Sequence, residues 1–78
     1  MTKSPLRNIP IKTFRDFLKW EGLSHIRTNG GHEIWSKEGL FRPVTFQTHK
    51  NPVPEKVVRQ ILKTIKSNAE NYIEFLKS

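Results

Sequence analysis

The chain has no cysteine and no long apolar run among its 78 residues. Without cysteine, neither disulfides nor thiolate zinc sites can hold the fold, so the core must come from aliphatic and aromatic packing. No stretch approaches the roughly 20 apolar residues of a membrane-spanning helix, and residues 1–5 begin no signal-peptide core. We therefore expect a cytoplasmic protein with no membrane partner.

Acidic side chains are also scarce, with 7 Asp and Glu against 14 Lys and Arg. Residues 1–66 carry 13 basic and 5 acidic side chains, a net charge of +8, whereas residues 67–78 carry a net charge of −1. Such a field attracts polyanions, so nucleic acid is the expected partner. A chain this short cannot enclose a deep active site, which favours an open surface acting on a polymer such as RNA.

Apolar spacing and turn residues predict an α-β-β-β-α order. A helix is expected from Pro10 to Glu21, with Gly22 as its stop, and a second helix is expected to begin at Pro54. Strands are expected near 23–28, 31–37 and 40–47, and Pro43 marks the third as an edge. Ser67-Asn68-Ala69-Glu70 has capping-box spacing, so a short helical tail should run from there to about Leu76.

This order predicts an α+β fold like that of double-stranded-RNA-binding domains, with a short C-terminal helical tail. Residues 1–9 are expected to form a loosely ordered basic arm. Residues 10–78 are expected to form a single RNA-binding and ribonuclease domain.

Two turns predict how the strands pair. A two-residue turn at Asn29-Gly30 would set Arg27 opposite His32, and one at Glu38-Gly39 would set His32 opposite Thr45. A cation about 5 Å away lowers the pKa of an imidazole. His32 would then be a neutral base at neutral pH.

The same pairing predicts two faces of the sheet. The face covered by the helices would carry Ile26, Trp35, Leu40, Val44 and Phe46. The other face would carry Arg27, His32 and Thr45 together with Leu23, Ile34 and Phe41. Because these last three are apolar, we expect the tail helix or a partner to cover part of that face.

Among the three histidines, His32 has the context of a catalytic group. It follows Gly30 and Gly31, and a glycine lets a backbone or a phosphate approach closely. His25 lacks this context and reads as a structural strand residue. His49, which precedes Lys50, fits a second acid–base group, a phosphate contact or a plain loop residue. The histidines are too scattered for a metal site, and no cofactor is expected.

Two further surfaces are candidate binding sites, one on the second expected helix and one at Trp20. The second helix carries a basic stripe of Lys56, Arg59, Lys63 and Lys66, which is either a solvated face or a track for phosphates. Trp20 points away from the apolar side of the first helix. It is either simply exposed, covered by the tail, or an anchor for a protein partner, and we favour the last.

An ordered series of segments resembles the HicA family of bacterial toxins. The matching stretches are Glu21-Gly22-Leu23, Gly30-Gly31-His32-Glu33-Ile34-Trp35, Val44 to His49 leading into Pro54, and Arg59-Gln60-Ile61-Leu62-Lys63. Together they cover roughly residues 10–76. Gln47 stands where the family commonly has proline, whereas His49 keeps the family's histidine.

This resemblance implies an mRNA interferase, the toxin of a type II toxin–antitoxin pair. His32 would be its catalytic residue, and a HicB-type antitoxin would cover the active site. As general base, His32 would take a proton from a ribose 2′-OH, and Arg27, Arg42 or Lys50 could stabilise the charged phosphorane. Two alternatives stay open, a non-catalytic RNA-binding module and a DNA-binding partner.

Overall fold

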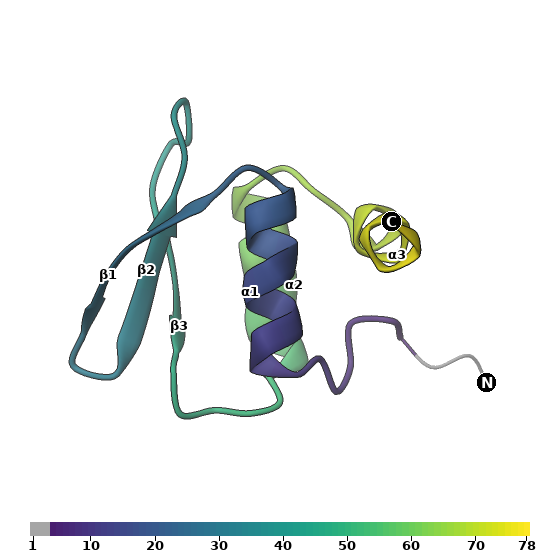
Figure 1. Ribbon diagram of the computed structural model, residues 1–78, viewed down its shortest axis with the longest axis horizontal. Helices are drawn as coiled ribbons and strands as arrows, with labels where there is room; N and C mark the ends of the chain where they lie inside the picture. Colours follow the sequence, from purple (N-terminus) through teal and green to yellow (C-terminus); the bar gives the residue numbers. More distant parts are fainter. Residues whose placement is uncertain (1–3) are drawn as a thin grey trace.

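The computed structural model describes residues 4–78 and has the predicted order of elements (Figure 1). The elements are α1 (Ile11–Trp20), β1 (Ser24–Asn29), β2 (His32–Ser36), β3 (Val44–Gln47), α2 (Glu55–Thr64) and α3 (Ala69–Lys77). The protein therefore has an α+β fold with the α-β-β-β-α order of double-stranded-RNA-binding domains, followed by a helical tail. The predicted fold class is confirmed.

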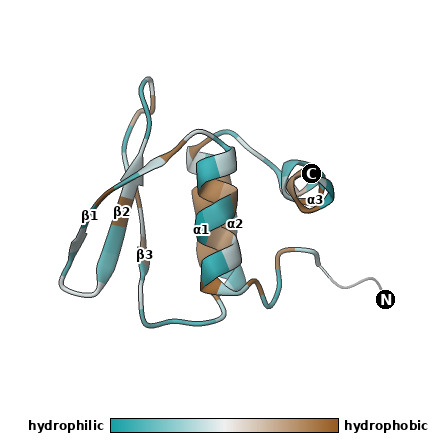
Figure 2. Ribbon diagram, viewed as in Figure 1, coloured by the Kyte–Doolittle hydropathy of each residue, from teal (hydrophilic) through white to brown (hydrophobic). Residues whose placement is uncertain are grey.

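The molecule is layered. The antiparallel sheet has the order β1-β2-β3, so β3 is an edge strand as Pro43 predicts. Helices α1 and α2 lie along one face of the sheet, and α3 lies beyond them (Figure 1). Helices α1 and α2 each carry hydrophobic and hydrophilic residues (Figure 2), as expected for helices with one buried side. Each helix within residues 4–78 is too short and too polar to traverse a lipid bilayer.

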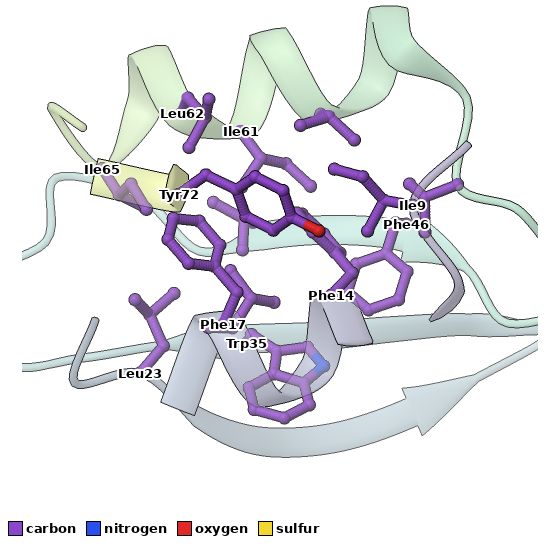
Figure 3. Packing of buried hydrophobic residues seen from close by; sticks show 14 of the residues in the cluster. Ile9, Phe14, Phe17, Leu23, Trp35, Phe46, Ile61, Leu62, Ile65 and Tyr72 are labelled. Carbon is purple, nitrogen blue, oxygen red and sulfur yellow. The ribbon is translucent and has the colours of Figure 1, made fainter. Parts of the chain in front are cut away.

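Aromatic side chains join the layers at the centre of the core (Figure 3). Phe14 of α1 meets Phe46 of β3 edge to face, with ring centroids 5.2 Å apart. Phe17 meets Tyr72 of α3 in the same geometry at 5.2 Å. Such pairs add about 0.5–1.5 kcal/mol each beyond the burial of their area. The tail helix is therefore part of the core, packed on α1.

Both α1 and α2 end in a residue with positive φ. At α1 this residue is Gly22 (φ +95°), and the N–H of Leu23 reaches back to the carbonyl of Leu18 at 2.9 Å. At α2 it is Lys66 (φ +58°), and the N–H of Ser67 reaches the carbonyl of Leu62 at 2.8 Å. These are Schellman ends, in which a left-handed residue turns the chain and satisfies late carbonyls. The stop at Gly22 is confirmed.

The cap of α3 differs from the expected capping box. Asn68 caps the helix, because its side chain accepts a hydrogen bond from the N–H of Asn71 at 2.8 Å. The hydroxyl of Ser67 instead donates to the carboxylate of Glu21, next to the end of α1. The boundary is therefore one residue later than the capping-box spacing implies.

Residues 4–9 differ from the loosely ordered arm that the sequence predicts. Leu6 and Ile9 are buried in the core, each only 2 % exposed. Ile9 also forms a bridge with Val53, whose N–H donates to the Ile9 carbonyl at 2.9 Å. The core therefore extends across the expected boundary at residue 10, while residues 1–3 of the arm lie outside the described chain.

The predicted register of the first hairpin is wrong, because the turn lies one residue later and each pairing is shifted by two residues. The turn is Gly30-Gly31, so that Asn29 pairs with His32 and Arg27 pairs with Ile34. Gly30 and Gly31 have φ of +58° and +85°, and glycine enters this region without the steric cost that asparagine carries. The second glycine therefore draws the turn one residue along the chain.

The predicted register of the second hairpin is also wrong. The expected turn does form, since the N–H of Leu40 donates to the carbonyl of Lys37 at 3.1 Å around Glu38 and Gly39. The strand after it nevertheless begins only at Val44, and His32 pairs with Gln47. Pro43 has no N–H to donate to the ladder, so pairing begins only after it.

Two of the expected face assignments are wrong, those of Ile26 and Leu23, whereas the pairing shift of two residues keeps the paired side chains on their faces. Trp35, Val44 and Phe46 are buried beneath the helices as predicted, and Leu40 is partly buried against them. Ile26 is the extra residue at a bulge in β1 and is 52 % exposed instead of buried. Leu23, expected on the outer face, is 3 % exposed in the core, and Phe41 is 96 % exposed. The tail helix packs on α1, so it does not cover the outer face.

Candidate active site and nucleic-acid interface

His32 is the first residue of β2 and lies directly after the Gly30-Gly31 turn. Its neighbour Glu33 is buried under the helices, so alternation along the strand places His32 on the outer face. The side chain of His32 is exposed and is flanked across the sheet by Asn29 and Gln47. An accessible imidazole therefore stands at one end of an open sheet.

A second imidazole lies against the same turn. A Cβ atom on Gly31 would come within 3.2 Å of both Cδ2 and Nε2 of His49. The segment is tied to the turn by its backbone, because the N–H of Thr48 donates to the Gly31 carbonyl at 2.8 Å. The close approach that Gly31 permits is thus made by the His49 ring. Gly31 is thus followed by His32 in the chain and is approached in space by the His49 ring.

A buried carboxylate supports this arrangement from below. Glu33 is 3 % exposed, and both of its oxygens accept hydrogen bonds from Arg15 of α1. Trp35 Nε1 donates to it at 3.1 Å and Thr48 Oγ1 at 2.8 Å. Arg15 Nη2 also donates to Thr48 Oγ1 at 3.2 Å. The network therefore joins α1, β2 and the segment that carries His49.

Hydrogen bonding sets the ionisation of this pair. The bonds from Arg15, with further ones from Thr48 and Trp35, lower the pKa of Glu33 from 4.5 to about 2 despite its burial. The hydrogen bonds between Arg15 and Glu33 likewise raise the pKa of Arg15 above its ordinary value. A carboxylate with so low a pKa is a poor proton acceptor. Glu33 accordingly serves to position its neighbours and not to move protons.

Arg27 and Thr45 lie one row away from their expected places. Both pair with Ile34, which puts them on the outer face with His32 but diagonal to it. Diagonal neighbours across a sheet are about 7–8 Å apart. Arg27 therefore does not lie directly opposite His32, and the expectation of a neutral base at His32 loses its electrostatic basis. Arg27 remains placed to meet a phosphate bound on this face.

Among the remaining basic candidates, the lysines are exposed, whereas Arg59 is bonded to neighbouring side chains. Lys50 directly follows His49, and Lys56 and Lys63 are exposed on α2. Arg59 is engaged elsewhere, since its Nη2 lies 2.6 Å from Glu55 and donates to Ser4 at 3.1 Å. Lys50 is thus next to the glycine turn only through its neighbour His49, and Arg59 is used to hold Ser4. The role of Lys56 stays a prediction.

His25 and Trp20 each have structural neighbours. The ring of His25 hydrogen-bonds to Thr28 at 2.9 Å and meets Trp35 edge to face at 5.5 Å, as its reading as a strand residue implies. Trp20 stacks against Phe17 and also meets Phe75 of α3. It is still 43 % exposed, so the tail covers only part of it. Its contact with a protein partner stays a prediction.

Sequence reasoning missed the supporting network, although one signal was available. Glu33 alternates with Trp35, so a strand that buries Trp35 also buries this carboxylate. A buried carboxylate requires a cation or several donors. The signal did not identify Arg15 or Thr48, because each comes from a distant segment.

Within residues 4–78, no cluster of three or more His, Asp and Glu side chains is arranged to hold a metal ion. No protein-family model, curated protein or solved structure matches the chain. The site itself is therefore what indicates a function.

Proposed function

We propose that the protein is the toxin of a type II toxin–antitoxin pair, an mRNA interferase of the HicA type with His32 as its catalytic residue. One observation carries the proposal: an exposed imidazole on a glycine turn, with a second imidazole seated against the same turn. A net charge of +7 supports an anionic polymer as the substrate.

Two imidazoles at one turn suit cleavage of RNA by acid–base chemistry. His32 takes the proton from a 2′-OH, the freed oxygen attacks the adjacent phosphorus, and the bond from phosphorus to the 5′-oxygen breaks. His49 supplies the proton that the leaving 5′-oxygen needs. The products are a 2′,3′-cyclic phosphate and a free 5′-OH, with no metal required. Each proton transfer contributes a factor of about 10²–10⁴.

Nearby cations complete the proposed site. Lys50 and Arg27 are available to stabilise negative charge on the phosphorane, as oriented cations do in phosphoryl transfer. The requirement for a 2′-OH restricts cleavage to RNA. Such an enzyme acts in the cytoplasm, where mRNA is found. A HicB-type antitoxin would neutralise it by covering the outer face, with Trp20 as a further contact.

Three histidine variants test the catalytic claim. We expect His32→Ala and His49→Ala each to lower the rate of RNA cleavage at least 100-fold, with the wild-type activity retained in EDTA. His25→Ala is the matched control, because the ring of His25 is engaged with Thr28 and Trp35, and it should leave the rate unchanged. The cleaved ends should carry 2′,3′-cyclic phosphates.

The same variants decide between the alternatives. RNA binding without cleavage by any of the four proteins would favour the non-catalytic RNA-binding module. Retained binding to a DNA duplex, with RNA left intact, would favour the DNA-binding partner. Equal cleavage by the wild type and His32→Ala would remove His32 from the mechanism.

A further inference from the structure

A groove of about 810 Å³ runs between the edge strand β3 and helix α2. It lies apart from the glycine turn, since its outer end is formed by the β2–β3 loop at the opposite end of the sheet (Figure 1). The lining side chains are Phe41, Arg42, Pro43, Val44, Thr45, Gln60, Ile61, Lys63 and Thr64. Arg42, expected from the sequence to stabilise the phosphorane, therefore lies in this groove and not beside His32.

Phe41 is the most unusual residue of the groove. Its side chain is 96 % exposed, although the adjacent Leu40 is partly buried against the core. The loop that carries Phe41 is constrained on both sides, by the Lys37–Leu40 hydrogen bond and by Pro43. The ring is therefore displayed to solvent by an anchored loop. Exposed aromatic rings on such loops commonly mark binding sites.

The charge of the groove selects the kind of ligand. Arg42 and Lys63 line it, and no Asp or Glu within residues 4–78 does so. Thr45, Gln60 and Thr64 add hydroxyl and amide groups that can bond to phosphates or bases. An aromatic platform beside cations is the arrangement by which proteins bind unpaired bases and the backbone that carries them.

We propose that this groove is a subsite for single-stranded nucleic acid, in which an unpaired base stacks on Phe41 and neighbouring phosphates bind Arg42 and Lys63. The link to cleavage rests on the proposed function. Strand β3 runs from the groove toward Gln47, opposite His32. The six residue-to-residue steps from Phe41 to Gln47 therefore span at most roughly 20 Å. A strand lying along this edge would join the two sites, with several nucleotides between the stacked base and the scissile phosphate.

Binding of a substrate that cannot be cut tests the subsite separately from catalysis. The probe is a fluorescein-labelled, single-stranded 12-nucleotide DNA, which lacks the 2′-OH, and the readout is Kd by fluorescence anisotropy. We expect Phe41→Ala to raise Kd about 5- to 100-fold, since one base–aromatic stack is lost. Phe41→Trp should bind at least as well as the wild type. Ile26→Ala, which shortens an exposed apolar side chain on β1, should leave Kd unchanged.

The outcomes distinguish this subsite from the proposed function. Wild-type affinity in Phe41→Ala would overturn the subsite even if the protein cleaves RNA, and would leave the exposed ring for a protein partner. Equal affinity of the wild type for the single strand and its duplex would also overturn it. Loss of binding in Phe41→Ala would support it even if no RNA is cleaved.

Discussion

Glu33 is the residue on which the geometry of the proposed site depends. It is the meeting point of donors from α1, from β2 itself and from the segment after β3. Because Thr48 both donates to Glu33 and bonds through its N–H to Gly31, the carboxylate helps to hold His49 beside the turn. Burial of an ion pair is costly, but removal of one member is costlier still, since the other is left unpaired.

Replacement of Glu33 by glutamine should lower the free energy of unfolding by about 3 kcal/mol. Glutamine keeps the shape, but its single carbonyl oxygen can accept from Trp35 or from Thr48 and not from both, because these donors meet different oxygens of Glu33. The loss therefore combines the missing charge opposite Arg15 with one lost hydrogen bond. Urea denaturation followed by circular dichroism measures it. Glu55→Gln is the control, because that carboxylate pairs with Arg59 at the surface and should matter far less. Equal losses in the two variants would contradict the role of burial.

The pKa of Glu33 also predicts how stability depends on pH. The group has a pKa of about 2 in the folded protein and an ordinary value of 4.5, so the folded state favours its ionised form. This contribution is complete above pH 4.5 and is lost as the pH falls toward 2. It amounts to about 3 kcal/mol. Urea midpoints measured between pH 6 and pH 2.5 should fall less steeply for Glu33→Gln than for the wild type.

Alanine at Gly31 should impair cleavage more than alanine at Gly30. Both glycines have positive φ, so each substitution strains the turn. Only a Cβ at Gly31 meets His49, at 3.2 Å, whereas none of the described atoms lies within 4 Å of one at Gly30. We expect Gly31→Ala to reduce the cleavage rate about 10-fold relative to Gly30→Ala, since small misplacements of catalytic groups are costly. Equal rates would show that the position of His49 is irrelevant.

At the scale of elements, the hairpins show what the sequence can and cannot predict. Helix positions followed from apolar spacing and from Gly22, which are local signals, and they are correct. Strand pairing depended on a choice between Asn29-Gly30 and Gly30-Gly31, two overlapping turns that differ little in local preference. A shift of the turn by one residue moves every pairing by two residues, so Arg27 faces Ile34 and not His32.

The candidate site could likewise be predicted only in part, namely where its residues are neighbours in the sequence. His32 and Gly31 were recognisable because they adjoin in sequence and form a turn by themselves. The contact of His49 with Gly31 was not, since it depends on the register of β3 and on a loop whose shape no local pattern specifies. Arg15 was missed for the same reason, because its carboxylate partner comes from another element.

The end of α2 offers a test of local strain. Lys66 has φ +58° at a position where glycine is the usual residue. Lys66→Gly should therefore raise the free energy of unfolding by about 0.5–1 kcal/mol, a modest gain because glycine also loses more entropy on folding. Lys66→Ala removes the same charge but keeps the Cβ, so it should give no gain. Thermal unfolding of the two variants compares them, and a gain in both would point to charge instead.

Across the whole molecule, charge is separated from the helical tail. The positive excess lies in residues 1–66, whereas residues 67–78 are slightly acidic and include α3. Helix α3 lies on the side of α1 and α2 that is remote from the sheet (Figure 1). A polyanion should therefore approach the sheet and its β3 edge, where His32 and the Phe41 groove lie, and not the tail. The site at His32 and the Phe41 groove therefore lie in the same positive electrostatic field.

This field predicts a particular dependence of binding on salt. If Arg27, Arg42, Lys50 and Lys63 each meet one phosphate, the logarithm of the binding constant for single-stranded DNA should fall with the logarithm of salt concentration with a slope of about −3. Arg42→Gln should reduce the magnitude of that slope by about 0.7, whereas Phe41→Ala should weaken binding without changing the slope, because stacking releases no counterions. Lys77→Gln, at the end of α3, is the control and should change neither. A slope that changes equally in Arg42→Gln and Lys77→Gln would mean that the net charge acts as a whole and that the strand follows no defined path along β3.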